Sequence, residues 1–278
     1  MHISVIIPTI NESQAISKAV KSCWEAGADE IIVADGGSTD ATISIAKSLR
    51  CDVVISSPGR GVQQNHGASL ATGDLFLFLH ADCYLAPTCL DQIRQNRQSL
   101  DHLYGAFRQT IPNCGRIYRL IERGNAQRVK RLKMIYGDQG LFVSSQLFHL
   151  VGGFPEIPLM EDVAISRQLS RHAVPQLLSG PLTISPRRWE RYGPIRQTLR
   201  NWTLLTRFFL GQSPESIASL YRRHDQKRGS LKKLMDTRTH PQKSFDLKTN
   251  KPSGSHPSSA DRTSDELRFR RSTVFFRK

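Results

Sequence analysis

Residues 74–82 read Asp-Leu-Phe-Leu-Phe-Leu-His-Ala-Asp, an apolar run followed at once by polar side chains. Because the apolar residues from Leu75 to Leu79 do not alternate with polar ones, they predict a strand that is buried on both faces of a sheet. No longer apolar run occurs in the chain. A membrane-spanning helix needs ~20 apolar residues, so we expect no membrane span.

This run is the last strand in a regular alternation of strands and helices over roughly the first 100 residues. We expect strands at 3–7, 30–34, 52–55 and 74–79, and helices at 12–26, 41–49, 63–71 and 87–100. The alternation predicts an α/β fold with a mostly parallel central sheet, right-handed crossovers and flanking helices. The later rhythm is less regular, and there we expect strands at 102–110, 140–144 and 181–185 and helices at 116–133, 145–151, 160–172, 195–210 and 214–221.

The charge of the chain is unevenly distributed. Its 278 residues include 39 Lys+Arg and 24 Asp+Glu, a formal net charge of +15, and more than half of this excess lies in residues 223–278. Few apolar residues accompany that charge, so we expect a disordered basic tail after a folded domain of residues 1–222. A nucleic-acid-binding protein is a less favoured interpretation, because the basic residues are diffuse and no recognition motif accompanies them.

The cysteines indicate a reducing compartment. The chain has 5 cysteines, and none of them forms a C-x-x-C pair. They are Cys23, Cys51, Cys83, Cys89 and Cys114. This spacing fits neither a disulfide framework nor a zinc knuckle. The sequence also enters a strand-like segment directly, without the basic leader of a secretory signal, so we expect a cytoplasmic protein.

Polar side chains follow each of the four early strands. They occur at Pro8–Glu12, Asp35–Asp40, Arg60–Gly61 and His80–Asp82. Ligands of such sheets bind at the carboxyl ends of the strands, so we expect these groups to meet at one edge. The Gly-x-Gly-x-x-Gly and Gly-x-Ser-x-Gly patterns are both absent, which disfavours a dinucleotide dehydrogenase and a serine hydrolase.

Two of these strand ends suggest particular chemistry. Asp35 before two glycines is either part of a turn with a helix cap or a carboxylate that accepts from a nucleobase N–H. His80 and Asp82 point the same way along an extended segment, so both could reach one divalent ion. The neighbouring Cys83 is interpreted as a small buried hydrophobic residue.

Two later motifs also carry chemistry. Glu161 and Asp162 start a predicted helix, where they either complement the helix dipole or supply a general base for an acceptor hydroxyl. Arg187 and Arg188 could grip a diphosphate with their guanidinium groups. The alternative for the arginines is a solvated basic turn beside a packed Trp189.

In their order and spacing, these motifs resemble those of the family 2 glycosyltransferases. The matching stretches are Pro8-Thr-x-Asn-Glu12, Asp35-Gly-Gly-Ser-x-Asp40, His80-Ala-Asp82, Gly152-Gly-Phe-Pro155 and Glu161-Asp162. The resemblance covers about residues 1–222 and implies a GT-A fold, with a nucleotide-binding half at about 1–100 and an acceptor and catalytic half at about 101–222. His80 stands where the family has the first Asp of Asp-x-Asp. With His80-Ala-Asp82, Gly137-Asp-Gln-Gly140 and Glu161-Asp162, the chain most resembles the arsenosugar-biosynthesis branch.

The resemblance also implies roles for single residues. The donor-binding set is Pro8, Thr9, Glu12 and Asp35 around the nucleoside, together with Arg60, Arg187 and Arg188. Asp82 and His80 would hold Mg²⁺ or Mn²⁺ on the diphosphate. Asp162 or Glu161 would be the catalytic base.

The implied reaction is the inverting transfer of a sugar from a nucleotide-sugar, UDP-sugar before GDP-mannose, to a small-molecule or lipid hydroxyl. An alternative is a prenyl-phosphate glycosyltransferase that acts at the membrane surface. The amphipathic stretch at 202–210, with Arg200 and Arg207, could lie on acidic lipid. The other interpretation of that stretch is a helix packed on the catalytic domain.

Overall fold

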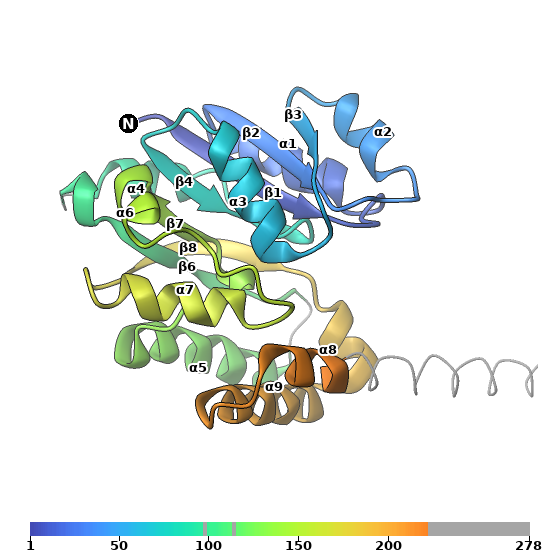
Figure 1. Ribbon diagram of the computed structural model, residues 1–278, viewed down its shortest axis with the longest axis vertical. Helices are drawn as coiled ribbons and strands as arrows, with labels where there is room; N and C mark the ends of the chain where they lie inside the picture. Colours follow the sequence, from blue (N-terminus) through green and yellow to red (C-terminus); the bar gives the residue numbers. More distant parts are fainter. Residues whose placement is uncertain (97–98, 113–114, 222–278) are drawn as a thin grey trace, which may run out of the picture. The chain divides into compact units, whose positions relative to one another are not determined.

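An eight-stranded sheet forms the centre of the fold, as Figure 1 shows for the computed structural model. The structure describes residues 1–96, 99–112 and 115–221, all of which belong to one unit of the chain. The predicted tail at 223–278 lies outside the described residues, so its disorder remains a prediction. The strands are ordered β3-β2-β1-β4-β7-β6-β8-β5.

The first half of the chain alternates strands and helices as expected. Its elements are β1 (Ile3–Thr9), α1 (Ile16–Glu25), β2 (Glu30–Asp35), α2 (Thr42–Lys47), β3 (Asp52–Ile55), α3 (Arg60–Leu70), β4 (Leu75–Phe78), β5 (Cys83–Leu85) and α4 (Cys89–Arg94). β1, β2, β3 and β4 are paired in parallel. This part of the prediction is confirmed.

The second half completes the sheet and adds helices below it. Its elements are β6 (Tyr104–Thr110), α5 (Arg116–Leu132), β7 (Leu141–Ser144), α6 (Ser145–Leu150), α7 (Glu161–Leu169), β8 (Gln176–Ile184), α8 (Arg187–Tyr192) and α9 (Pro194–Phe209), with short 3-10 helices at Leu100–His102 and Gly137–Gln139. β7 is antiparallel to β4 and β6, and β8 is parallel to β6. The sheet is therefore mixed but mostly parallel.

Alternate side chains of the central strands fill two separate cores. Leu75 and Leu77 belong to the core on one face of the sheet, whereas Phe76 and Phe78 belong to the core on the other face. Both sets have at most 1% of their surface exposed. This explains the apolar run at 74–79, because a strand covered by helices on both faces has no side facing water.

The structure corrects the length of one expected helix, adds a strand that was not predicted and excludes one of two alternatives for 187–189. The predicted helix at 87–100 is shorter, because α4 ends at Arg94. β5 has only three residues, too few to show a periodicity, and forms by antiparallel pairing with β8. The alternative of a basic turn at 187–189 is wrong, because these residues belong to the helix α8.

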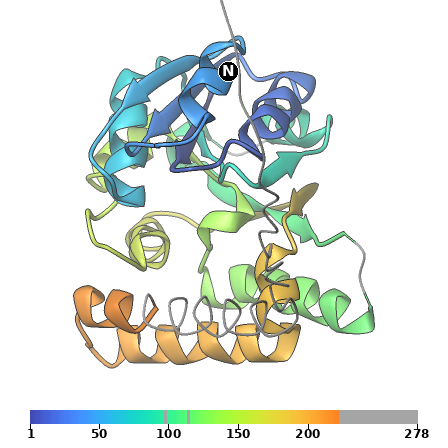
Figure 2. The same ribbon diagram turned by 90° about the vertical axis from the view of Figure 1, so that its right-hand side faces the viewer.

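The lower part of the molecule is helical. Figures 1 and 2 both place α5 and α9 on the side away from β1, β2 and β3. A further helical stretch covers 214–221. None of the helices in the described ranges combines the length and the apolar composition that crossing a membrane requires.

β6 passes closely between its two neighbours at Gly105, which is paired with Phe142 of β7 and Gln176 of β8. A Cβ atom at this position would lie 2.1 Å from the carbonyl oxygen of Gln176 and 2.6 Å from Phe142 Cζ. Neither contact leaves room for a methyl group, so the glycine allows the three strands to pair.

We therefore expect Gly105→Ala to lower the free energy of unfolding by about 2–3 kcal/mol, because the methyl group overpacks the sheet. Gly124→Ala in α5 is the matched control. A Cβ there meets nothing within 4 Å, and alanine in a helix is favoured over glycine by about 1 kcal/mol. Urea unfolding followed by circular dichroism should shift in opposite directions for the two variants; equal midpoints would contradict the interpretation.

Candidate active site

Arg187 joins two carboxylates that come from different strand ends. Its Nη2 lies 3.1 Å from Glu12 Oε2 and 3.1 Å from Asp82 Oδ2. Glu12 follows β1 and Asp82 follows β4, so the predicted meeting of polar groups at one edge of the sheet is confirmed for these two strands. Burial acts to lower the pKa of Arg187, but its hydrogen bonds to both carboxylates outweigh this and raise it. The three side chains are partly exposed, which leaves them accessible to a ligand.

The pairing of β5 with β8 places Arg187 at this position. Cys83 lies opposite Ile184 in that pairing, and the next residue, Ser185, donates its N–H to the carbonyl oxygen of Asp82 over 3.2 Å. The Ser185 hydroxyl then accepts a hydrogen bond from Arg187 Nε at 3.0 Å. A three-residue strand thus fixes the arginine beside the carboxylates.

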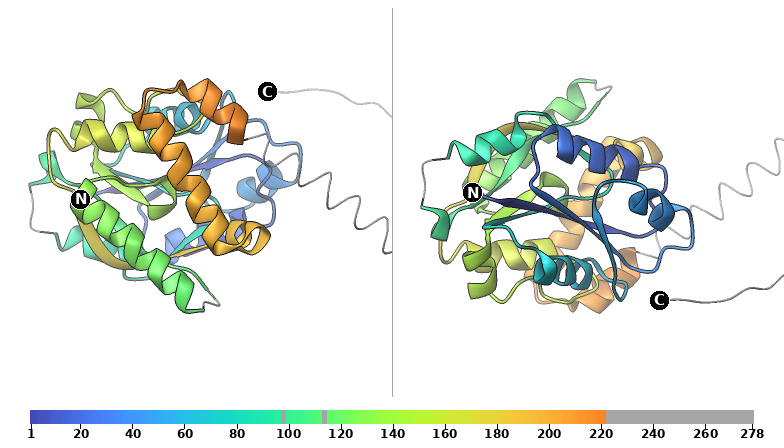
Figure 3. Two further views of the ribbon diagram at one scale, coloured as in Figure 1. Left: turned by 90° about the horizontal axis from the view of Figure 1, so that it is seen from below. Right: turned by 90° about the horizontal axis from the view of Figure 1, so that it is seen from above.

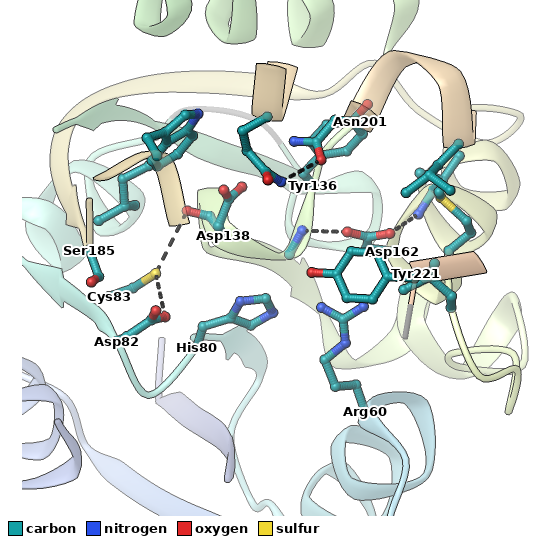
Figure 4. A pocket seen from close by; sticks show the side chains of 18 of the residues that line it. Arg60, His80, Asp82, Cys83, Tyr136, Asp138, Asp162, Ser185, Asn201 and Tyr221 are labelled. Atoms are coloured by element: carbon teal, nitrogen blue, oxygen red, sulfur yellow. Dashed lines mark hydrogen bonds between the residues drawn. The ribbon is translucent and has the colours of Figure 1, made fainter. Parts of the chain in front are cut away.

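His80, Asp82 and Cys83 form a cluster of possible metal ligands. One ligand atom from each residue lies within 4.8 Å of the others. The structure brings together the predicted pair, His80 and Asp82, and adds Cys83. The Cys83 sulfur lies 3.9 Å from Asp82 Oδ1. The sequence analysis had interpreted Cys83 only as a small buried hydrophobic residue. Figure 4 shows the three side chains along one edge of a cavity.

Asp35 lies inside the protein rather than on the surface of the strand end. Its side chain has 0% exposure, and its carboxylate accepts hydrogen bonds from the N–H groups of Gly37 and Ser38 at 2.9 and 2.7 Å. The hydroxyls of Ser38 and Thr9 donate to the same carboxylate at 2.6 and 3.1 Å. Asp35 and Thr9 therefore stabilise the turn after β2. Gly37, within this turn, is exposed.

Pro8, the remaining residue predicted at the nucleoside pocket, is buried in β1. The ends of β1 and β2 are joined by a residue that the sequence analysis missed. Gln63 of α3 donates its amide to the carbonyl oxygens of Thr9 and Ala34 at 2.7 and 2.8 Å. A buried glutamine at the start of an otherwise polar helix gives no recognisable signal in the sequence.

Arg60 and Glu161 form an ion pair across the site in which the glutamate is buried and the arginine half-buried. Arg60 Nε lies 2.7 Å from Glu161 Oε1, and its Nη2 donates to Glu161 Oε2 at 3.3 Å. The Glu161 side chain is only 2% exposed. Burial raises the pKa of Glu161 to about 7, against the opposing effect of Arg60, and nearby Asp162 adds to the rise.

Asp162 lies differently from its neighbour. Its Oδ2 accepts the N–H of Gly137 at 2.8 Å, and its Oδ1 accepts the N–H of Val163 at the same distance. It is part of the cavity wall, whereas Glu161 is not. Gly137 is required for this approach, since a Cβ there would lie 2.5 Å from His80 Nε2.

Some of these groups line a cavity of about 370 Å³, whereas Glu12, Asp35 and Arg187 are not among its lining residues. Its wall comes from the strand ends, the 137–139 turn, α7, α8, α9 and the helical stretch at 214–221. The lining residues are Arg60, His80, Asp82, Cys83, Tyr136, Gly137, Asp138, Pro158, Leu159, Met160, Asp162, Val163, Ile184, Ser185, Trp189, Gln197, Asn201, Leu204 and Tyr221. Figure 4 shows Asp82 and His80 on one side of this space, with Asp162 and Arg60 on the other.

A polar network beneath the 137–139 turn was not predicted. Arg128 of α5 donates to Gln139 Oε1 at 2.6 Å and stacks 3.4 Å from the centre of the Tyr136 ring. Gln109 donates to the carbonyl oxygen of Asp138 at 3.0 Å and accepts from Asn125 at 2.7 Å. Asn125 and Arg128 are three residues apart on one helix face. This spacing is a weak signal within a basic helix.

Two buried polar atoms in the cavity wall have no hydrogen-bond partner within the described ranges: Trp189 Nε1 and Gln197 Oε1. Their residues are 8% and 2% exposed. A buried donor and a buried acceptor without partners are costly unless a ligand or water satisfies them. The side chain of Arg188 lies outside the description, so its predicted role stays untested.

The model of the glycosyl transferase family 2 matches residues 4–153, from β1 to the loop after α6. The chain belongs to this family. An uncharacterized glycosyltransferase of Rickettsia prowazekii (strain Madrid E) is 32% identical over 139 residues, which is 49% of this chain and 40% of that one. The chain thus spans less than half the length of this curated relative.

Solved structures support the same fold. Residues 1–349 of TarS from S. aureus, in complex with UDP-GlcNAc, match with a TM-score of 0.52 at 19% identity, over 66% of this chain and 58% of that one. The mannosyltransferase PcManGT from Pyrobaculum calidifontis, in complex with GDP-Man and Mn²⁺, matches with a TM-score of 0.51 at 20% identity, over 66% and 56%. The expected GT-A fold of the family 2 glycosyltransferases is confirmed.

The raised pKa of Glu161 predicts a pH dependence of stability. The pKa in the folded state, about 7, lies above the ordinary value of 4.5, so the folded state binds this proton more tightly than the unfolded state does. The free energy of unfolding therefore falls as pH rises between these values. Relative to Glu161→Gln, wild type should lose about 2 kcal/mol between pH ~5 and pH ~7.5 in urea unfolding.

The exposed Glu156 provides the control for this comparison. Glu156→Gln should follow the wild-type pH dependence. If the Glu161→Gln and wild-type curves run parallel over the same range, the ion pair with Arg60 keeps Glu161 ionised and the prediction is wrong.

Proposed function

We propose that this family 2 glycosyltransferase moves a sugar from a nucleoside-diphosphate donor, UDP-sugar in preference to GDP-mannose, to a hydroxyl acceptor with inversion. The observation that carries the proposal is the position of Asp162. It lies in the wall of the same cavity as Asp82 and His80, so a base and a diphosphate site face one enclosed space. The UDP-GlcNAc complex of TarS supports UDP as the nucleotide.

The donor end of the cavity would bind the nucleoside diphosphate. Arg187, with a guanidinium already held between two carboxylates, can turn its charge to a phosphate. Arg60 lines the cavity from the other side. Asp35 and Thr9 would act indirectly, by holding the turn after β2, while Glu12 keeps Arg187 in place. Arg188 and Pro8 keep their proposed places in the donor-binding set.

The side chains of His80, Asp82 and Cys83 fit a divalent cation, because a nitrogen, an oxygen and a sulfur can converge on one point. A mixed donor set of this kind suits Mn²⁺ better than Mg²⁺, which prefers oxygen ligands. When bound, the cation would offset charge on the leaving diphosphate. Asp82 would exchange its ion pair with Arg187 for the metal.

Asp162 is the better candidate for the catalytic base. Its carboxylate faces the cavity, and two backbone N–H groups hold it in one orientation. It would accept the proton of the acceptor hydroxyl as that oxygen attacks the anomeric carbon from the side opposite the diphosphate. Glu161 is engaged by Arg60 and lies behind it, so it would fix the start of α7 rather than touch the acceptor.

Trp189 and Gln197 would bind the acceptor. The indole N–H can donate to an acceptor oxygen, and the Gln197 carbonyl can accept from a hydroxyl. Both groups line the cavity that Asp162 faces. This pairing favours a hydroxyl-bearing acceptor over a purely apolar one. The resemblance to the arsenosugar branch and the cytoplasmic location stay predictions.

Calorimetric titration with UDP tests the donor site. We expect micromolar binding in the presence of Mn²⁺ and much weaker binding without it. Asp82→Ala should abolish the effect of Mn²⁺, since it removes a proposed ligand and leaves Arg187 with one carboxylate partner. Asp52→Ala, at an exposed carboxylate in β3, is the control. Binding of GDP in place of UDP would change the nucleobase assigned to the donor from uracil to guanine. Failure to bind either nucleotide would contradict the proposal.

Replacement of Asp162 by Asn tests the base. The variant should bind UDP within about twofold of wild type, while sugar transfer falls by about 10²–10⁴-fold, the usual contribution of a general base. Release of UDP from UDP-sugars, measured with a panel of hydroxyl acceptors, gives the rate. A near-normal rate in Asp162→Asn would exclude Asp162 as the base. Loss of UDP binding would indicate a structural role instead.

A further inference from the structure

Helix α9 has two faces with opposite environments. Its inner face carries Gln197, Leu204 and Leu205, which are 2%, 7% and 6% exposed. Gln197 and Leu204 also line the proposed catalytic cavity. One side of this helix is therefore part of the site and cannot serve another partner.

The outer face of α9 is apolar and open. Its exposed apolar residues are Ile195 (62%), Leu199 (63%), Trp202 (58%), Phe209 (48%) and, just past the helix end, Leu210 (81%). The spacing of four, three and seven residues along the helix puts these side chains on one stripe. Within the described ranges nothing covers this stripe. A row of large apolar side chains is unusual on a surface that contacts only water.

Positive charge lies beside the stripe. Arg196 and Arg207 are exposed on one flank of α9, and the helix sequence contains no Asp or Glu. Neighbouring α5 adds exposed basic residues at Arg116, Arg119, Arg123, Lys130 and Arg131. Figure 3, seen from below, shows α5 and α9 on the same side of the molecule. We call the exposed sides of these two helices the α5–α9 face.

A second cavity, of about 300 Å³, opens on the basic flank of α9. Three arginines line it, namely Arg196, Arg200 and Arg207, and none of its lining residues is acidic. The rest of the wall is apolar or aromatic in large part, including Leu199, Leu220 and Tyr192. A cavity with this lining suits an anionic group attached to an apolar one.

We propose that the α5–α9 face binds the surface of an anionic lipid bilayer. The apolar stripe would enter the boundary between headgroups and acyl chains, with Trp202 at the interface. The arginines and lysines on its flanks would contact lipid phosphates. A second copy of the chain is a poorer occupant, because a symmetric contact would bring like charges together.

The orientation of α9 gives this contact a consequence for the active site. The stripe and the cavity-lining residues lie on opposite sides of one helix, so a bilayer on the outer side would leave the catalytic cavity open. The inference goes beyond the proposed transfer reaction and holds for a soluble or a lipid acceptor.

Sedimentation with sucrose-loaded vesicles tests the proposal on the full chain. We expect wild type to pellet with phosphatidylglycerol–phosphatidylcholine vesicles but not with pure phosphatidylcholine. The double variant Ile195→Ser/Trp202→Ser should lower the partition coefficient by about tenfold, since it removes two exposed anchors. Arg196→Glu/Arg207→Glu should reduce it by a similar factor and weaken its salt dependence, since the basic residues of α5 remain.

The matched control is Leu70→Ser/Leu150→Ser, which removes two apolar side chains of comparable exposure, 49% and 64%, elsewhere on the surface. It should pellet like wild type. UDP titration of every variant shows whether the cavity is intact and separates a failed membrane contact from a failed donor site.

Three results would overturn the proposal. Wild type could fail to pellet with anionic vesicles. The Ile195→Ser/Trp202→Ser variant could pellet fully, which would assign the binding to the basic residues at 223–278 that it retains. The same variant could convert a dimer to a monomer in analytical ultracentrifugation, which would make the stripe an interface between copies.

Discussion

The guanidinium of Arg187, held between Glu12 and Asp82, is the interaction on which the geometry of the site depends. Two carboxylates at the ends of adjacent parallel strands repel each other unless a cation lies between them. Here the cation is the guanidinium of Arg187, which lies 105 residues beyond Asp82 in the sequence. The pairing of β5 with β8 positions it between the carboxylates. A diphosphate would offer Arg187 another anionic partner and leave Asp82 free for a divalent ion, without a change in the sheet.

The adjacent acidic residues Glu161 and Asp162 have different surroundings, and we therefore propose different roles for them. The first side chain is buried against Arg60, and the second faces the cavity with both oxygens oriented by backbone N–H groups. The negative charge of Asp162 adds to the effect of burial in raising the pKa of Glu161. Asp162 rather than Glu161 lies in the cavity wall, so its position makes it the better proposed base.

The sequence predicts the parallel half of the sheet well, because a buried strand and an amphipathic helix each leave a clear periodicity. It also brings Glu12 and Asp82 together, since strand ends meet at one edge. It does not predict the burial of Asp35, which depends on donors from the turn after its own strand and from Thr9. Contacts such as the ion pair of Arg60 with Glu161 join residues 101 positions apart. No local pattern encodes them.

Helix α9 shows why such a pattern can also be ambiguous. An apolar stripe predicts burial without specifying what provides it, whether a protein core or a lipid surface. The structure separates the two for this helix. Leu204 and Leu205 pack inward: Leu204 lines the cavity, and Leu205 packs against Met134 and Val163. Trp202 and Leu199, on the opposite side, remain exposed beside arginines. Packing in the protein core accounts for the first pair alone, and the proposed contact with a lipid bilayer would remove the second pair from water.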